Sequence, residues 1–351
     1  MKRVFAIAAG VAAAVSLSAS VANAAPTANS AVPITGQGSL YKEVKKPVDI
    51  SFTANITPGA GDTTLLPLME SKFTLPKDLA FVPDPKMPVC TEVNAGNSNF
   101  SGATAISLCP NSIVGDGTAN IMLAGQVAAL ITDPELTIFN GGVDSSGGGI
   151  LAIHAYSAST NAGIFMTGAI QNGTLDVLIP RLTADSATST FTLSIPGTKG
   201  QDKGYAEATC STGKYTTSAV ITLGNRSSGG VVSNETSLTT DPTTTDCVGL
   251  AGKAKLSAKV KGPAKVKSGK KGTFKVTLKN TGTASAKSVK VKASGGGKGS
   301  ASGGTIKPGT SKTVKVKVKV TGKKGKKVTV KFKTTASGGV VANAKAKVKV
   351  G

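Results

Sequence analysis

Hydrophobic and polar residues alternate with a period of two along much of the chain. Over residues 48–56, the apolar positions alternate with polar ones, and the apolar residues are Val48, Ile50, Phe52, Ala54 and Ile56. A period of two is typical of a strand that buries one face. This segment is therefore predicted to enter a sheet with the apolar side chains pointing into the core.

The same pattern recurs in short segments downstream, each bounded by Gly, Asp, Asn, Ser or Pro. The further strands predicted in the first part of the chain cover residues 73–75, 119–123, 136–139, 150–156, 164–170, 175–179, 191–195 and 220–223. No segment after residue 24 combines a 3.6-residue apolar stripe with a capping signal, so no helix longer than two or three turns is expected. About ten short strands in roughly 200 residues favour a sandwich or a barrel.

A second block of alternation begins near residue 254. Its predicted strands place Val, Leu or Phe on one face and Lys or Thr on the other, over residues 273–280, 288–292, 313–320, 328–333 and 344–350. The glycine-rich segment 295–300 is expected to be a loop without nucleotide-binding spacing. Six or seven strands in about 98 residues fit an immunoglobulin-like sandwich. The fold class is thus predicted to be all-β: a disulfide-bonded β-sandwich or barrel domain, then a lysine-rich Ig-like β-sandwich.

Charge divides the chain at the same place. The 351 residues include 41 Lys and Arg against 18 Asp and Glu, a formal net charge of +23. Residues 253–351 hold 28 lysines and no Asp, Glu, Arg or His. The expected organisation is a signal peptide over 1–24, a flexible leader over 25–38, a secreted β-domain with two disulfides over 39–250, and a basic Ig-like domain over 254–351.

The N-terminus has the features of a secretory signal. A positive start, an apolar run over 4–15 and the small residues Ala22 and Ala24 predict cleavage after Ala24. The apolar run is shorter than the ~20 residues of a membrane-spanning helix, so no transmembrane segment is expected in the mature chain. The expected location is extracellular, either released or held non-covalently at the cell wall.

The four cysteines, Cys90, Cys109, Cys210 and Cys247, form an even set. In an oxidising compartment disulfides are the default, and three pairings are open. We expect the sequential pairing, Cys90 with Cys109 and Cys210 with Cys247, because it closes the shortest loops. A metal site is not expected, since neither pair has the ligand spacing of a zinc knuckle and the chain has one histidine.

Catalytic chemistry has few candidates. His154, the one histidine, lies in a predicted strand without a Gly-x-Ser-x-Gly elbow, so a structural role is expected. The candidate carboxylates lie beside turn residues or at strand ends, where turn chemistry explains them: Asp116, Asp133, Glu135, Asp144, Asp176 and Asp185. No catalytic residue and no cofactor are therefore expected. A secreted hydrolase, or a carbohydrate-binding protein whose C-terminal domain is only a spacer, is the alternative.

Three segments of the second block carry a family resemblance. Val-Thr-Leu-Lys-Asn-Thr-Gly at 276–282, the apolar alternation over 286–291 and Ile-Lys-Pro-Gly-Thr-Ser at 306–311 resemble the pattern of the CARDB and DUF11 group of bacterial cell-surface domains. The resemblance covers nearly all of 254–351. It implies an Ig-type β-sandwich that serves as a spacer or adhesion module and brings no catalytic residues.

The first block resembles a different group. Segments 73–77, 88–90, 109–119 and 136–141, together with the later cysteines, resemble an uncharacterised family of secreted β-rich proteins from actinobacteria. This resemblance implies a β-fold and a Cys90–Cys109 bridge, and it implies no activity.

The lysines are the strongest functional signal. Alternating lysines protect the edges of sheets, but one or two per edge suffice, and a surface of one sign repels itself unless an anionic partner offsets the charge. We therefore predict non-specific binding of anionic cell-surface polymers or lipid headgroups through Lys290, Lys292, Lys315, Lys317, Lys319, Lys323, Lys324, Lys326, Lys327, Lys331, Lys333, Lys345, Lys347 and Lys349.

Other partners follow less directly from the composition. Sequence-specific nucleic-acid binding is not expected, because the basic region lacks Arg and has two Phe. Other surface proteins remain an open class of partner. The predicted function is a non-enzymatic secreted or cell-surface protein of the adhesion or scaffold type.

Overall fold

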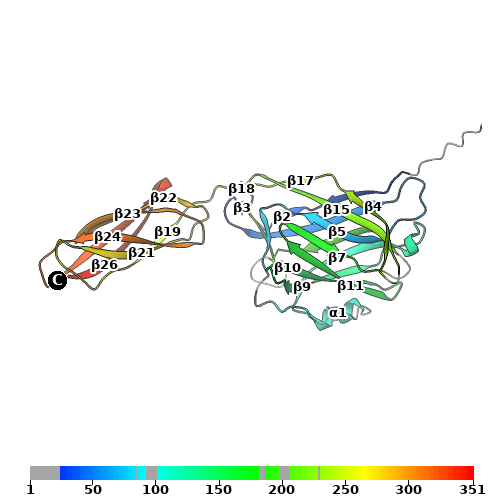
Figure 1. Ribbon diagram of the computed structural model, residues 1–351, viewed down its shortest axis with the longest axis horizontal. Helices are drawn as coiled ribbons and strands as arrows, with labels where there is room; N and C mark the ends of the chain where they lie inside the picture. The colour runs from blue at the N-terminus through cyan, green and yellow to red at the C-terminus, as the bar shows by residue number, and fades with distance from the viewer. Residues whose placement is uncertain (1–23, 84, 92–100, 182–185, 198–204, 228–229) are drawn as a thin grey trace, which may run out of the picture.

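The computed structural model describes residues 24–83, 85–91, 101–181, 186–197, 205–227 and 230–351. The expected signal peptide lies almost entirely outside these residues, as does Asp185. The described chain forms two β-rich bodies joined near residue 250, with the C-terminus at the far end of the second (Figure 1). Strands make up most of both bodies, so the prediction of an all-β fold is confirmed.

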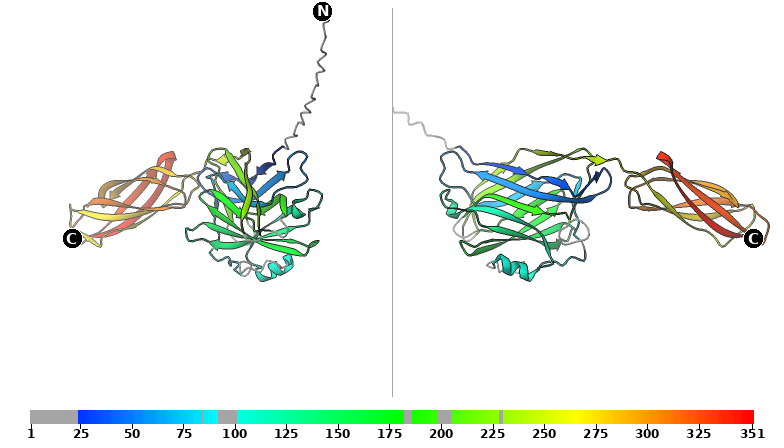
Figure 2. Two further views of the ribbon diagram at one scale, coloured as in Figure 1. Left: turned by 45° about the vertical axis from the view of Figure 1, so that its right-hand side comes forward. Right: turned by 180° about the vertical axis from the view of Figure 1, so that it is seen from behind.

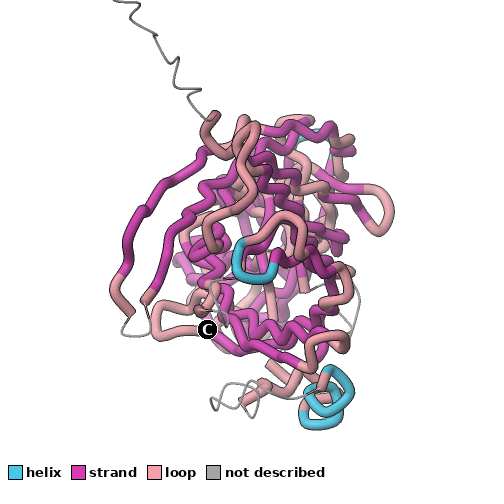
Figure 3. Tube along the Cα trace, turned by 90° about the vertical axis from the view of Figure 1, so that its right-hand side faces the viewer, coloured by secondary structure: helices cyan, strands magenta, loops and turns pink. Residues whose placement is uncertain are grey.

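The first body is one curled sheet, seen end-on in Figure 3. Its hydrogen-bonded order is β16-β15-β5-β12-β11-β10-β9-β7-β13-β4-β14-β6, and β1, β2, β8 and β17 attach to its sides. The strands are β1 (Thr27–Ala31), β2 (Ile34–Gly36), β4 (Lys46–Thr57), β5 (Leu68–Thr74), β6 (Leu79–Phe81), β7 (Ile113–Met122), β8 (Leu130–Ile131), β9 (Glu135–Val143), β10 (Gly149–Ser157), β11 (Ala162–Gln171), β12 (Thr174–Leu178), β13 (Ala187–Ile195), β14 (Ala206–Ala208), β15 (Lys214–Arg226), β16 (Val232–Thr239) and β17 (Thr243–Asp246).

The core of this body lies inside the curl. The alternating apolar residues of β4 are all buried, as the sequence predicts. Phe73 of β5 packs edge-on against Phe52 of β4, with ring centroids 5.3 Å apart, and against Phe191 of β13 at 6.0 Å. Aromatic pairs favour this edge-to-face arrangement. Strands from opposite ends of the sheet order therefore face each other across one core.

The expectation of a flexible leader over 25–38 is wrong. Strands β1 and β2 pair antiparallel with β4, and Val32 and Ile34 are buried. The Ser30 hydroxyl lies 2.7 Å from the hydroxyl of Thr240, and Thr243 donates to the Ser30 carbonyl at 2.9 Å. Small polar residues lower the hydrophobic signal of β1, but its backbone groups complete a ladder that the composition does not reveal.

Short helices and two short strands complete the described part of the first body. Helix α1 (Gly102–Leu108) is seven residues long and is capped by Ser101, whose side chain accepts a hydrogen bond from the Thr104 N–H, and a 3-10 helix spans Leu123–Gly125. Strand β18 (Gly249–Leu250) pairs in parallel with β3 (Leu40–Tyr41) at the junction with the second body. No helix in the described part of the chain is long and apolar enough to cross a bilayer.

The second body is a β-sandwich, seen from two sides in Figure 2. Its strand order is β19-β21-β24-β23-β22-β25-β26-β20. The core contains alternate valines and the pair Phe274 and Phe332, whose ring centroids are 5.3 Å apart. The strands are β19 (Leu256–Lys261), β20 (Lys265–Val266), β21 (Lys271–Asn280), β22 (Ala286–Gly295), β23 (Gly297–Ile306), β24 (Ser311–Val320), β25 (Lys327–Ala336) and β26 (Val340–Val350).

The prediction of a loop over 295–300 is wrong, because β22 ends at Gly295 and β23 begins at Gly297, so that Gly296 alone lies between the two strands. A Cβ on Gly297 would lie 2.6 Å from a methyl carbon of Val318, and one on Gly299 would lie 2.3 Å from the Lys317 carbonyl oxygen. Glycine therefore lets β23 approach β24 more closely than other residues allow. Since β23 has few apolar side chains, the alternation that predicts the other strands is absent here.

Candidate functional site

Two disulfides hold the first body. Cys90 bonds to Cys109 and Cys210 bonds to Cys247, with Cα atoms 5.5 and 6.0 Å apart. The sequential pairing is thus confirmed. The first disulfide packs with α1 over the outer face of β9 and β10, in an apolar cluster that includes Phe139.

His154 lies on the same outer face of β10. It is 1% exposed and sits on β10 opposite Thr137 of β9 and Phe165 of β11. Ala152, two residues earlier on the same strand face, belongs to the disulfide cluster. A histidine in this buried position is out of reach of a polymeric substrate and contributes to packing.

The candidate carboxylates are spread over separate turns and strand ends. Asp133 accepts hydrogen bonds from the Ser159 N–H at 2.7 Å and the Ser157 hydroxyl at 2.8 Å, and chiefly the Ser159 N–H lowers the pKa of Asp133. Asp144 accepts from Ser146, and this side-chain hydrogen bond lowers the pKa of Asp144. Such bonds favour the ionised form and stabilise turns.

Three further candidate carboxylates lie on strands of the first body. Asp176 pairs with Lys72 at 3.1 Å, while Asp116 and Glu135 are exposed on neighbouring strands. Among the residues that the structure describes, no group of three or more His, Cys, Asp or Glu side chains could hold a metal ion.

The predicted polyanion-binding lysines are all exposed, but the structure divides them into three groups. The first group lies on the outer face of β22, β25 and β26, which we call the β25 face: Lys290, Lys292, Lys327, Lys331, Lys333, Lys345, Lys347 and Lys349. The second lies on the outer face of β24, the β24 face: Lys315, Lys317 and Lys319. The third, Lys323, Lys324 and Lys326, occupies the turn between β24 and β25. They do not form one patch.

Both faces hold lysines that the prediction omitted. The β24 face also includes Lys259, Lys261, Lys271, Lys275, Lys279 and Lys298, and Lys265 of β20 lies beside Lys349. Most of these lysines follow the same alternation as the predicted ones, so the sequence already contained the signal for them.

Many of these lysines face one another directly across the ladders. The register pairs Lys292 with Lys333, Lys331 with Lys345, and Lys327 with Lys349 on the β25 face, and Lys275 with Lys315 and Lys271 with Lys319 on the β24 face. Like charges that lie directly opposite each other destabilise a sheet. The arrangement therefore carries an electrostatic cost that no acidic residue within 253–351 offsets.

A shallow depression crosses the β25 face over β23, β22 and β25. Its polar lining consists of three lysines and three hydroxyl residues: Lys290, Lys292, Lys333, Ser300, Ser302 and Thr335. Ammonium and hydroxyl groups all donate hydrogen bonds to anionic oxygens. The hydroxyls of β23 were missed by the sequence reasoning because no strand was expected there.

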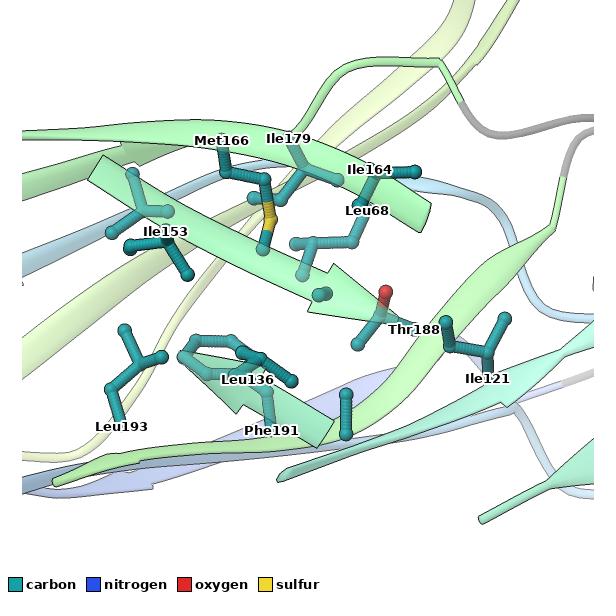
Figure 4. A pocket seen from close by; sticks show the side chains of 13 residues that line it. Leu68, Ile121, Leu136, Ile153, Ile164, Met166, Ile179, Thr188, Phe191 and Leu193 are labelled. Carbon is teal, nitrogen blue, oxygen red and sulfur yellow. The ribbon is translucent and has the colours of Figure 1, made fainter. Parts of the chain in front are cut away.

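The first body contains an apolar cavity of about 40 Å³ inside the curl of the sheet (Figure 4). Strands β7, β9, β10, β11 and β13 contribute most of its lining. Thr188 is the one polar residue among those that line it. The period-two pattern predicts the inward residues, but it cannot show that they leave a space.

A comparison with protein families bears on the second body. Residues 253–345 match the CARDB family. The resemblance drawn from the three C-terminal segments is thereby supported, and the second body is called the CARDB-like domain below. Both lysine faces lie on this domain. The actinobacterial resemblance of the first body stays a prediction.

Among solved structures, the chain is similar to the T6 backbone pilin of serotype M6 Streptococcus pyogenes, at 8% identity and a TM-score of 0.26. The match covers 92% of this chain and 52% of the pilin, so the chain spans about half the length of that protein. A TM-score this low does not establish a shared fold. No curated protein matches the chain.

Proposed function

We propose that the protein is a non-enzymatic, extracellular protein of the adhesion or scaffold type whose CARDB-like domain binds anionic polymers of the cell surface. The observation that carries this proposal is the placement of the lysines on strands that need no edge protection. The two disulfides and the similarity to CARDB domains support an extracellular setting.

The edges of the CARDB-like sheet are β19 and β20. They carry Lys259, Lys261 and Lys265. Most of the other strand lysines lie on β21, β22, β24 and β25, which have hydrogen-bonded neighbours on both sides, although β24 pairs with β23 only at Lys319 and Val320: Lys271, Lys275, Lys279, Lys287, Lys290, Lys292, Lys312, Lys315, Lys317, Lys319, Lys327, Lys331 and Lys333. A strand paired on both sides cannot accept another strand, so edge protection explains few of these residues.

A bound polyanion would offset the repulsion between lysines that lie opposite each other, and the relief of this repulsion would add to the binding affinity. Each pair of like charges directly opposite costs roughly 0.2–1 kcal/mol, and a phosphate or carboxylate lying between two ammonium groups removes that repulsion. Lysine presents a compact point charge without the planar fork of arginine. Binding should therefore follow charge density and show little preference for the geometry of the anion.

The two lysine faces lie on opposite layers of the sandwich, which limits how a partner binds. A flat anionic surface meets one face at a time, whereas a flexible polymer reaches both. We therefore favour a flexible anionic polymer over lipid headgroups as the main partner. The first body carries 11 basic and 18 acidic residues from residue 25 to 252 and is not expected to contribute.

The test is a titration of the mature protein with long-chain polyphosphate at several salt concentrations. Affinity should fall steeply between low and physiological ionic strength, because screening and counterion effects both weaken binding. Lack of measurable binding at low salt would overturn the proposal and leave solubility as the role of the lysines.

Two matched variants separate the faces. Lys290→Gln/Lys292→Gln/Lys333→Gln removes three charges around the depression on the β25 face, and Lys315→Gln/Lys317→Gln/Lys319→Gln removes three from the β24 face. Similar losses of affinity in both variants are expected for binding by charge density. Vesicles of anionic lipid, compared with neutral vesicles, measure the contribution of headgroups.

A further inference from the structure

A more polar cleft adjoins the apolar cavity of the first body. The cleft and the cavity share Ile121, Ala155 and Ile164 as lining residues. In Figure 4, Ile121, Ile164 and Thr188 lie toward one end of the cavity, while Ile153 and Leu193 lie toward the other. The cavity and the cleft therefore adjoin each other at the Ile121 end.

Polar groups gather in the cleft, away from the cavity interior. The cleft lining adds Tyr156, Ser157, Ser186 and Arg181 to the shared apolar residues. Tyr156 is partly exposed, and its hydroxyl donates to the Asn161 side chain at 2.9 Å. An apolar interior that leads to a polar mouth has the polarity of a site for an amphipathic molecule.

Two arginines lie near this mouth. Arg181 lines the cleft, and Arg226 donates from Nη2 to the carbonyl oxygen of Leu68 at 3.2 Å, where Leu68 lines the cavity. The pKa of Arg226 is lowered by burial and, secondarily, by the positive charge of Arg181. They are the only arginines after residue 3 in the entire chain.

Arginine is the residue best suited to bind carboxylate or phosphate, because its donors form a planar fork. An anionic headgroup in the cleft would lie beside Arg181 and near the hydroxyl residues Ser157 and Tyr156, which also line it.

We propose that the cavity and cleft bind a small amphipathic anion, with a short aliphatic tail in the cavity and a carboxylate or phosphate headgroup beside Arg181 and Arg226. The small volume of the cavity limits the enclosed end of the tail to a few carbons, and the rest of an eight-carbon chain would lie along Leu123, Ile131 and Pro134 of the cleft. Apolar cavities of proteins stay dry and take up apolar groups of matching size. This site lies in the first body and is independent of polyanion binding by the CARDB-like domain.

The experiment is calorimetric titration of the mature protein with octanoate, octyl phosphate, octanol and acetate. Saturable binding of octanoate or octyl phosphate is expected, with weaker binding of octanol and none of acetate, because both the tail and the charge contribute. The tighter of the two anions identifies the headgroup. Absence of saturable binding by both anions overturns the proposal.

Variants test the two halves of the site. Arg181→Gln should weaken binding of the anion about tenfold and leave octanol unchanged, since it removes one charged hydrogen-bond donor group. Lys214→Gln, which removes a cation from the far end of β15, is the matched control and should change neither. Anion binding that is insensitive to Arg181→Gln and Arg226→Gln contradicts the assigned headgroup site.

Filling the cavity tests the tail. Ala155→Leu adds a side chain into the lining and should abolish binding of both octanoate and octanol. Thermal unfolding shows whether Ala155→Leu folds. If it does not, Ala119→Val, a smaller change at another lining position, replaces it as the cavity-filling variant. Octanoate binding unchanged in a folded cavity-filling variant would overturn the proposal.

Discussion

Lys292 on β22 and Lys333 on β25 lie directly opposite each other in an antiparallel ladder, although both side chains are exposed and positively charged. Cross-strand pairs of this kind usually carry opposite charges or apolar side chains. The CARDB-like domain instead repeats the like-charged arrangement on both of its faces. Its stability should therefore depend on ionic strength in a way that few small β-sandwiches share.

Lys333→Gln should raise the free energy of unfolding of this domain at low salt by about 0.2–1 kcal/mol, because it removes the repulsion from Lys292. Lys347→Gln is the matched control, since Lys347 lies opposite Thr329 and has no charged cross-strand partner there. Thermal unfolding of the two variants in low and high salt makes the comparison. Two results would contradict a repulsion between Lys292 and Lys333. The two variants could change the free energy of unfolding equally at low salt, or the difference between them could persist at high salt, where repulsion is screened.

Gly299→Ala should destabilise the CARDB-like domain. Its Cβ would lie 2.3 Å from the Lys317 carbonyl oxygen, so β23 must move away from β24. Backbone shifts of this kind cost about 1–3 kcal/mol. Ser300→Ala, an exposed neighbour on the same strand, is the control, and denaturant unfolding measures both. A neutral Gly299→Ala would show that the close approach of β23 to β24 is not required.

Removing the first disulfide with Cys90→Ala/Cys109→Ala should lower the free energy of unfolding of the first body by about 3 kcal/mol, the loop-closure estimate for a short loop. The loss should also expose the outer face of β10, because the disulfide packs with α1 over it. Hydrogen exchange of the β10 amides reports this exposure. Cys210→Ala/Cys247→Ala, at the other side of the body, should leave β10 protected.

Asp144 should stabilise its turn only while it is ionised. Its lowered pKa means that this contribution is complete above the ordinary value of 3.8 and is lost as the pH falls through the lowered pKa. Asp144→Asn should therefore destabilise the first body at pH 7, and the difference from wild type should shrink in strong acid. Asp241→Asn, at an exposed position, controls for the change in net charge. A stability difference between wild type and Asp144→Asn that grows on acidification would contradict a stabilising role of the ionised carboxylate.

Much of the fold could be predicted because alternation reports burial directly. Val48, Phe52 and Ile56 fall on the buried face of β4, and Val316 falls on the buried face of β24, as period two requires. The cysteine pairing was also within reach, since short loops are favoured over long ones. These features depend on local sequence or on simple chain statistics.

Other features depend on contacts that the linear pattern does not record. Strand β1 is held by hydrogen bonds between Ser30 and residues more than two hundred positions away, and β23 is made possible by glycines that carry no hydrophobic signal. The composition of the lysine region predicted its charge but not its division over two faces. That division follows from the sandwich, in which neighbouring strands in the sequence belong to different layers.

The junction between the two bodies determines how the protein would respond to tension. Strand β18 is held against β3 by only a two-residue parallel ladder, and three residues before Leu250 the chain is covalently tied to Cys210. A pull on the CARDB-like domain would therefore break the hydrogen bonds between Glu43 and Ser285 and strip β18, and then pass through the disulfide to Cys210, which follows β14. Residues 211–246, which include β15, β16 and β17, would form a loop that carries no tension. An extracellular protein held by its C-terminal domain could in this way bear force without separating β15 from β16 at the end of its first sheet.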